Sequence, residues 1–121
     1  MKTLAIWLFG AASFAASPAT AEFRAVSDQS EFLGFLSGKD LSNRLFGLTL
    51  SVTADGAIQG RAAGRDVTGD WSWQEGYFCR KMLWGEREIP YNCQLVEIRN
   101  GDEMRFTVDR GAGDSATFKL R

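Results

Sequence analysis

The stretch that decides the fold is LTLSVTADGAIQGRA, residues 48–62. In its first five residues, apolar side chains alternate with hydroxyl side chains, a period of two that is typical of a strand with one buried face. Asp55-Gly56 follows, a strong signal for a tight turn between antiparallel strands. Small or apolar side chains then recur at every second position: Ile58, Gly60 and Ala62. The stretch therefore predicts a β-hairpin.

The same pattern continues toward the C-terminus, with turn signals between the alternating segments. Seven strands are predicted within residues 46–121, and they centre on residues 46–52, 58–62, 67–73, 77–84, 91–99, 104–108 and 116–120. A longer corner, Gly85 to Pro90, is expected between the fourth and fifth. Regular short links favour an antiparallel meander that closes into a small barrel or folds into a two-sheet sandwich. Small inward residues (Gly60, Ala62 and Gly64) indicate a sharp bend, which favours the barrel-like roll.

One short helix is predicted before the strands, over residues 28–37. Asp28 can cap it, and Glu31 stands at the spacing of a capping box. Phe32, Phe35 and Leu36 form one apolar stripe at helical spacing, and Gly38 can end the helix. Because so short a helix is unstable alone, we expect it to plug an open end of the barrel or to cover a strand edge.

The N-terminus resembles a removable export signal. Lys2 is followed by an apolar run from Leu4 to Ala16 and by the small-x-small sequence Ala19-Thr20-Ala21. The run is shorter than the roughly 20 apolar residues of a membrane span. We therefore predict a signal peptide at residues 1–21 and a single domain at residues 22–121, without a stable membrane anchor after processing. The expected location is periplasmic or secreted.

Composition and cysteine content narrow the function. The chain has 14 basic and 15 acidic residues, and its arginines are scattered, which argues against nucleic-acid binding. Cys79 and Cys93 are predicted to form a disulfide, because export places them where disulfides persist. A metal site is the rival interpretation, but the chain has no histidine to complete one. No metal or cofactor is predicted.

The motifs that suggest catalysis are incomplete. Gly113-Asp114-Ser115 is reminiscent of nucleophile segments in serine hydrolases, which require a histidine as the base. Lys119 could replace that base, but it lies four residues along the same strand, about 13 Å away. The glycines of residues 60–65 are followed by a strand pattern, whereas a nucleotide-binding loop opens a helix. No catalytic residue is predicted, and whether the protein is an enzyme stays open, with the balance against it.

Aromatic residues give the one candidate binding site. Trp71 and Trp73 share a strand face, and Trp84 is expected to reach them from the next strand. Small barrels that hold a ligand often line the cavity mouth with aromatic side chains. Core packing is the alternative for these tryptophans. We predict that the three form an inner wall near one end of the roll.

Four segments together are similar to a family of short exported proteins of α-proteobacterial type: Gly69 to Trp73, Tyr77 to Arg80, Asn92 to Gln94 and Gly111 to Ala116. The resemblance covers most of the domain, includes the cysteine spacing and implies a periplasmic address. Some members carry the name dihydrodipicolinate reductase. True members of that enzyme class are far longer, with a nucleotide-binding domain and a histidine-containing catalytic segment. The residues of this chain do not support the activity.

The leading expectation is a non-enzymatic periplasmic domain that binds a small ligand or an envelope partner through the aromatic-rich end. The alternative is an inhibitor or accessory protein of an envelope enzyme, which would dock through an exposed loop at Gly85 to Tyr91. An unrecognised enzyme is the third.

Overall fold

The computed structural model describes residues 21–121, which form nine strands, one α-helix and two 3₁₀ turns. The predicted signal peptide, apart from its last residue, lies outside the described residues. The strands are β1 (Arg24–Ala25), β2 (Leu41–Asn43), β3 (Leu48–Val52), β4 (Ala57–Ala62), β5 (Arg65–Gln74), β6 (Tyr77–Trp84), β7 (Arg87–Arg99), β8 (Glu103–Thr107) and β9 (Ser115–Leu120). The helix is α1 (Gln29–Leu36), and the 3₁₀ turns are η2 (Arg44–Phe46) and η3 (Asp109–Gly111).

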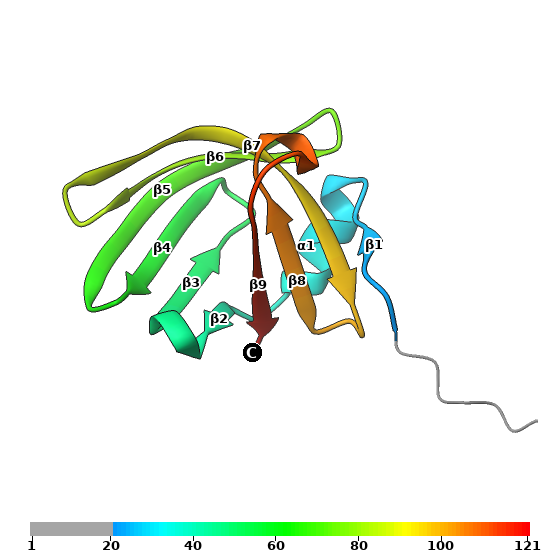
Figure 1. The fold of residues 1–121 in the computed structure, drawn as a ribbon, viewed down its shortest axis with the longest axis horizontal. Helices are drawn as coiled ribbons and strands as arrows, with labels where there is room; N and C mark the ends of the chain where they lie inside the picture. Colours follow the sequence, from blue (N-terminus) through cyan, green and yellow to red (C-terminus); the bar gives the residue numbers. More distant parts are fainter. Residues whose placement is uncertain (1–20) are drawn as a thin grey trace, which may run out of the picture.

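Eight strands close into an antiparallel barrel (Figure 1). From β2 to β9, each strand pairs with the next one in sequence, and β9 pairs back with β2 to complete the ring. The two-residue strand β1 lies outside the ring and pairs with the second half of β7. The predicted meander is confirmed, and of its two possible closures the molecule adopts the barrel.

Two glycines permit adjacent strands to approach closely within the ring. A Cβ atom at Gly60 of β4 would collide with the carbonyl oxygen of Thr49 on β3. A Cβ atom at Gly69 of β5 would collide in the same way with the carbonyl oxygen of Lys81 on β6. Gly64, expected to contribute to the bend, instead lies in the β4–β5 turn with φ of +82°.

The helix α1 supplies the centre of the core. Asp28 caps it, since the Asp28 carboxylate accepts a hydrogen bond of 2.8 Å from the Glu31 amide. The Glu31 carboxylate does not complete a capping box and instead pairs with Arg24 at 2.9 Å. Phe32 is fully buried, and its ring centroid lies 5.1–5.5 Å from those of three aromatic residues: Trp71, Trp73 and Phe78. The helix thus plugs one end of the barrel, one of the two places expected for it.

The predicted corner at Gly85 to Pro90 is wrong. The strand β7 begins at Arg87, and only Gly85 and Glu86 separate it from β6. This first part of β7 is mostly exposed on both faces, so the sequence shows no alternation there. The structure also adds the short strands β1 and β2 to the seven predicted ones.

A bulge in β7 determines which of its side chains face inward. Met82 pairs with Ile89, but Arg80 pairs with Asn92, so the register advances by one residue on β7. Pro90 lies in this interval, where its lack of an amide hydrogen costs no ladder hydrogen bond. Beyond the bulge, the buried and inward-facing residues of β7 are Gln94, Val96 and Ile98.

The predicted disulfide between Cys79 and Cys93 is confirmed. The two residues lie directly opposite each other on β6 and β7, on the outer face. Their Cα atoms are 3.9 Å apart, closer than the range of about 4.4–6.8 Å that we expected for a disulfide. Opposed residues on antiparallel strands come closest where they exchange no hydrogen bond, at about 4.5 Å. A disulfide fits an oxidising compartment.

Within residues 21–121, no helix combines the length and the apolar character that a membrane crossing requires.

Candidate ligand site inside the barrel

The two ends of the barrel differ in how their inward side chains are covered. At the end that α1 plugs, which we call the closed end, most inward apolar side chains are buried (Trp71, Phe78, Val96, Ile98, Met104 and Phe106), and Trp73 is half-buried. Toward the other end, which we call the open end, most inward apolar side chains are only half-buried (Leu48, Ala62, Met82, Trp84 and Phe118), and Val67 is buried. The barrel is therefore packed shut at one end and presents apolar surface at the other.

The β8–β9 connection leaves the open end uncovered. Its 3₁₀ turn η3 lies against the outer face of β7, where Gly111 approaches the Leu95 side chain. The Asn92 side chain holds it there through two hydrogen bonds with Asp109, of 2.8 and 2.9 Å. In Figure 1 this connection arches over β7 at the top of the view.

The expected wall of three tryptophans is wrong. Trp71 and Trp73 do come together, on the inner side of the closed end, where both rings pack on Phe32. Trp71 pairs with Arg80, whereas Trp84 pairs with Val67, so Trp84 lies four residues further along β6, about 13 Å away. The indole nitrogen of Trp71 donates to the Thr53 carbonyl at 2.9 Å, as expected for a buried core tryptophan.

Trp84 belongs to the open end. Its indole nitrogen donates to the Ala62 carbonyl at 2.7 Å, and the guanidinium of Arg65 lies 4.8 Å from its ring centroid. Of the three tryptophans proposed for ligand binding, it alone lies at the open end, and it does not line the cavity inside the barrel.

A buried arginine and the indole nitrogen of Trp73, which is buried without a hydrogen-bond partner, are two features of the described interior that packing does not explain. Arg80 lies on the inward face of β6, between Phe78 and Met82, and is 7% exposed. Its Nη1 donates to the carbonyl of Pro90 at 2.7 Å, which the bulge in β7 turns toward it. Its Nε is buried without a hydrogen-bond partner. Among residues 21–121, no carboxylate forms an ion pair with it.

The environment of Arg80 favours an anion. Burial lowers the pKa of Arg80 below its usual value, but a guanidinium stays charged in proteins. A buried charge without a counter-ion is costly, so such a cation normally has a partner. The planar guanidinium also suits two-point recognition of carboxylate or phosphate oxygens.

Arg80 faces a small cavity in the barrel. The cavity has a volume of about 40 Å³ and is lined by Arg80, the buried Gln94 and apolar side chains that include Met82, Phe106 and Phe118. A void of that size has room for one small group. The surface that it exposes is apolar, so the polar atoms of Arg80 and Gln94 border the cavity without opening onto it.

The other motifs considered in the sequence have local partners. The Ser115 hydroxyl lies 2.6 Å from that of Thr107, and Lys119 pairs with Asp102 at 3.1 Å, so the two do not form a Ser–Lys pair. Among the described residues, no cluster of three or more histidine, cysteine or acidic side chains is suited to hold a metal ion.

Sequence reasoning missed Arg80 and Gln94. The apolar side chains of Phe78, Met82 and Trp84 recur at every second position and indicate the inner face, and Arg80 has the same spacing. An arginine at an inward position of an otherwise apolar strand face was the available signal. Gln94 had the same kind of signal, because it shares the even spacing of Val96 and Ile98 on its strand.

Comparison with known proteins identifies no relative: no family model matches the chain, and no curated protein or solved structure shows significant similarity to it.

Proposed function

We propose that this protein is an exported, non-enzymatic binding domain whose barrel holds a small ligand with an anionic group and an apolar body. The observation that carries the proposal is Arg80, a buried guanidinium with an unpartnered Nε that borders an apolar cavity. The anionic group would occupy the cavity and accept hydrogen bonds from Arg80, with Gln94 beside it.

The apolar body of the ligand would extend toward the open end. The cavity of about 40 Å³ has room for a head group only, so the rest of the ligand must displace side chains. Met82 and Phe118 line the cavity and are half-buried. Methionine has three rotatable side-chain bonds and adapts easily to a new neighbour. Trp84 then lies on the route of entry and reports on occupancy.

The alternative expectation, an inhibitor that docks through a loop at Gly85 to Tyr91, loses its premise. Most of that segment is paired strand rather than a free loop. A small ligand inside the barrel is better supported than a partner bound at that hairpin.

The test compares decanoate with decanol, which share an apolar chain and differ in charge. Tryptophan fluorescence of the exported protein is followed during titration with each compound. We expect decanoate to bind at least about tenfold more tightly, because a charge-assisted hydrogen bond contributes about 1.5–3 kcal/mol. Arg80→Met should abolish this preference.

Arg105→Met is the matched control, because Arg105 is on β8, where it pairs with Glu97 at 2.8 Å on the outer face. It should retain the preference for decanoate. In the absence of ligand, Arg80→Met should raise the free energy of unfolding by about 1–3 kcal/mol, since it removes an unpaired buried charge. Equal decanoate binding by the Arg80→Met variant and the unmodified protein would refute the proposal.

A further inference from the structure

The 3₁₀ turn η2 presents two adjacent apolar side chains to solvent beside the open end. Leu45 is 86% exposed and Phe46 is 59% exposed. Most large apolar side chains of a small domain are at least partly covered, so two neighbours left out together indicate a contact surface.

The turn that carries them is held in place. The Asn43 side chain accepts a hydrogen bond of 3.1 Å from the Leu45 amide and donates one of 3.1 Å to the Thr117 carbonyl. The Phe46 carbonyl accepts a hydrogen bond of 3.1 Å from the Ala63 amide in the β4–β5 turn. Leu45 and Phe46 therefore project from a built support, which fixes them to the rim of the barrel.

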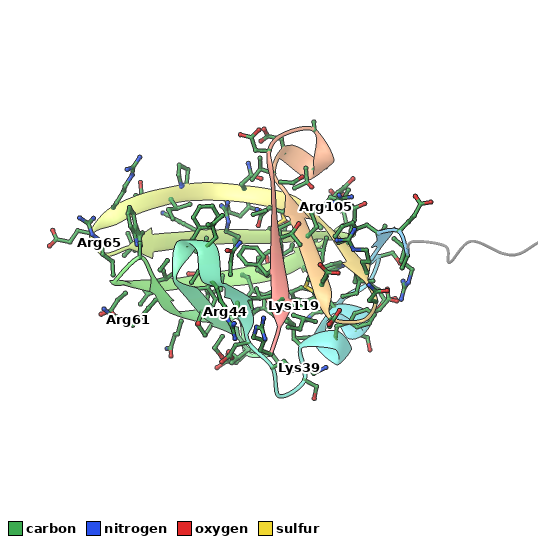
Figure 2. All side chains as sticks on the ribbon, turned by 60° about the horizontal axis from the view of Figure 1, so that its bottom comes forward. Lys39, Arg44, Arg61, Arg65, Arg105 and Lys119 are labelled. Carbon is green, nitrogen blue, oxygen red and sulfur yellow. A yellow bond between two sulfur atoms is a disulfide. The ribbon has the colours of Figure 1, made fainter. Side chains whose placement is uncertain are left out.

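Arginines surround the projecting pair. Arg44 precedes it, and Arg61 and Arg65 flank the neighbouring β4–β5 turn. Figure 2 shows Arg61 and Arg65 at one end of the barrel, with Arg44 on the adjacent turn. With Arg87 of the β6–β7 hairpin, this rim has four arginines, whereas its acidic residues are Asp66 and Glu86. The rim is thus net positive, although the whole chain carries a net charge of −1.

We propose that this rim docks on the surface of an anionic phospholipid bilayer, with Leu45 and Phe46 inserted among the lipid headgroups. Apolar side chains that enter the interface, together with cations that face anionic headgroups, are the two contributions that bind a peripheral protein to such a surface. The contact is a projecting tip, because Leu45 and Phe46 are both largely exposed on η2. A fluid surface accommodates such a tip, whereas a folded partner needs a complementary hollow.

The orientation that follows places the open end against the bilayer. Leu48 begins β3 just after η2, and Ala62 ends β4 just before the β4–β5 turn. Both residues are half-buried at that end. The docking proposal does not depend on what occupies the barrel interior, and its test requires no ligand.

The test is co-sedimentation of the exported, processed protein with vesicles of phosphatidylcholine alone and of phosphatidylcholine mixed with phosphatidylglycerol. We expect binding to the anionic vesicles only, and weaker binding as salt is added. Leu45→Ser combined with Phe46→Ser should reduce the affinity by about tenfold or more. Arg44→Gln should reduce it roughly fivefold. Tyr91→Ser, which removes another exposed large side chain, beside Gln74 near the opposite end of the barrel, should leave it unchanged.

Equal binding to neutral and anionic vesicles, or no binding to either at low salt, would overturn the proposal. Unchanged binding by the Leu45→Ser/Phe46→Ser variant would also overturn it. Sedimentation equilibrium tests the alternative that the tip binds a second copy of the chain. A dimer of the unmodified protein that is absent in the double variant would support that alternative and contradict docking on lipid. Circular dichroism checks that the variants remain folded.

Discussion

The two residues with most influence on the interior, Arg80 and Gly60, differ in how far the sequence reveals their roles. Gly60 was recognised as an inward small residue in an alternating strand, and the structure shows the backbone contact that requires it. The inward position of Arg80 was not predicted, because its charge was given more weight than its two-residue spacing from Phe78 and Met82. An arginine is normally a surface residue, and only its place between Phe78 and Met82 shows otherwise. Exceptions of this kind are expected at functional sites.

The contact at Gly60 leads to a prediction with an internal control. Gly60→Ala should lower the free energy of unfolding by about 1–3 kcal/mol, because the added methyl forces β3 and β4 apart. Gly34 lies in α1 with open space around it and no unusual backbone angle. Gly34→Ala should therefore raise the free energy of unfolding by about 0.5–1 kcal/mol. Urea denaturation of both variants measures the difference, and equal effects would show that the close strand approach is relaxed in solution.

At the scale of elements, turn signals predicted most of the strands, because short hairpin links specify both the reversal and the approximate pairing. Strands β1 and β2 have two and three residues, too few to show a period of two. They exist because β7 and β9 offer backbone partners, which are far away in the sequence. Pairing fixed by tertiary closure cannot be deduced from local pattern.

The separation of Trp84 from Trp71 was predictable at this scale. The sequence places a short link at Glu75-Gly76, and a regular hairpin through it sets Trp84 opposite Val67. The prediction assumed that Trp71 and Trp84 are in contact because both face inward. By contrast, predicting which end of the barrel is closed requires the position of α1. The sequence pattern did not decide whether α1 plugs an end or covers a strand edge.

The disulfide links two strands that a hairpin already joins, so its effect should be on stability rather than on pairing. Reduction should lower the free energy of unfolding by up to about 3 kcal/mol, the chain-entropy value for a loop of about 15 residues. Thermal denaturation with and without a reductant measures this, with far-UV circular dichroism expected to show unchanged strand content. Cys79→Ala combined with Cys93→Ala should match the reduced protein. Free thiols in the folded, exported protein would contradict the bond.

At the scale of the whole molecule, closure of the ring leaves the barrel with two unlike ends. The closed end is a continuous core around Phe32, and most of the stabilising burial is there. The open end combines half-buried apolar residues with the arginine-rich rim. The docking proposal places function at the less stabilised end, and the ligand proposal extends from the middle of the barrel toward it, as is usual for regions that must admit a ligand.

Export should remove the segment that precedes the barrel. The intact mass of the protein recovered from the envelope should correspond to residues 22–121, because Ala19-Thr20-Ala21 fits the small-x-small rule for signal cleavage. Ala21→Lys should block processing and leave the precursor in the membrane fraction. A mature protein that retains Leu4 to Ala16 would overturn the periplasmic assignment and, with it, the expectation of an oxidising environment.

The bulge at Pro90 makes this part of the barrel tolerant of the loss of a single codon. Deletion of Tyr91 would remove the extra residue and leave a regular ladder, in which Arg80 still lies opposite Asn92 and Cys79 still lies opposite Cys93. The cross-link and the inward position of Gln94 would therefore survive. The Pro90 carbonyl that now accepts a hydrogen bond from Arg80 would lose the irregularity that positions it. One in-frame deletion would thus separate the environment of Arg80 from the rest of the fold, although it touches neither a cysteine nor an arginine.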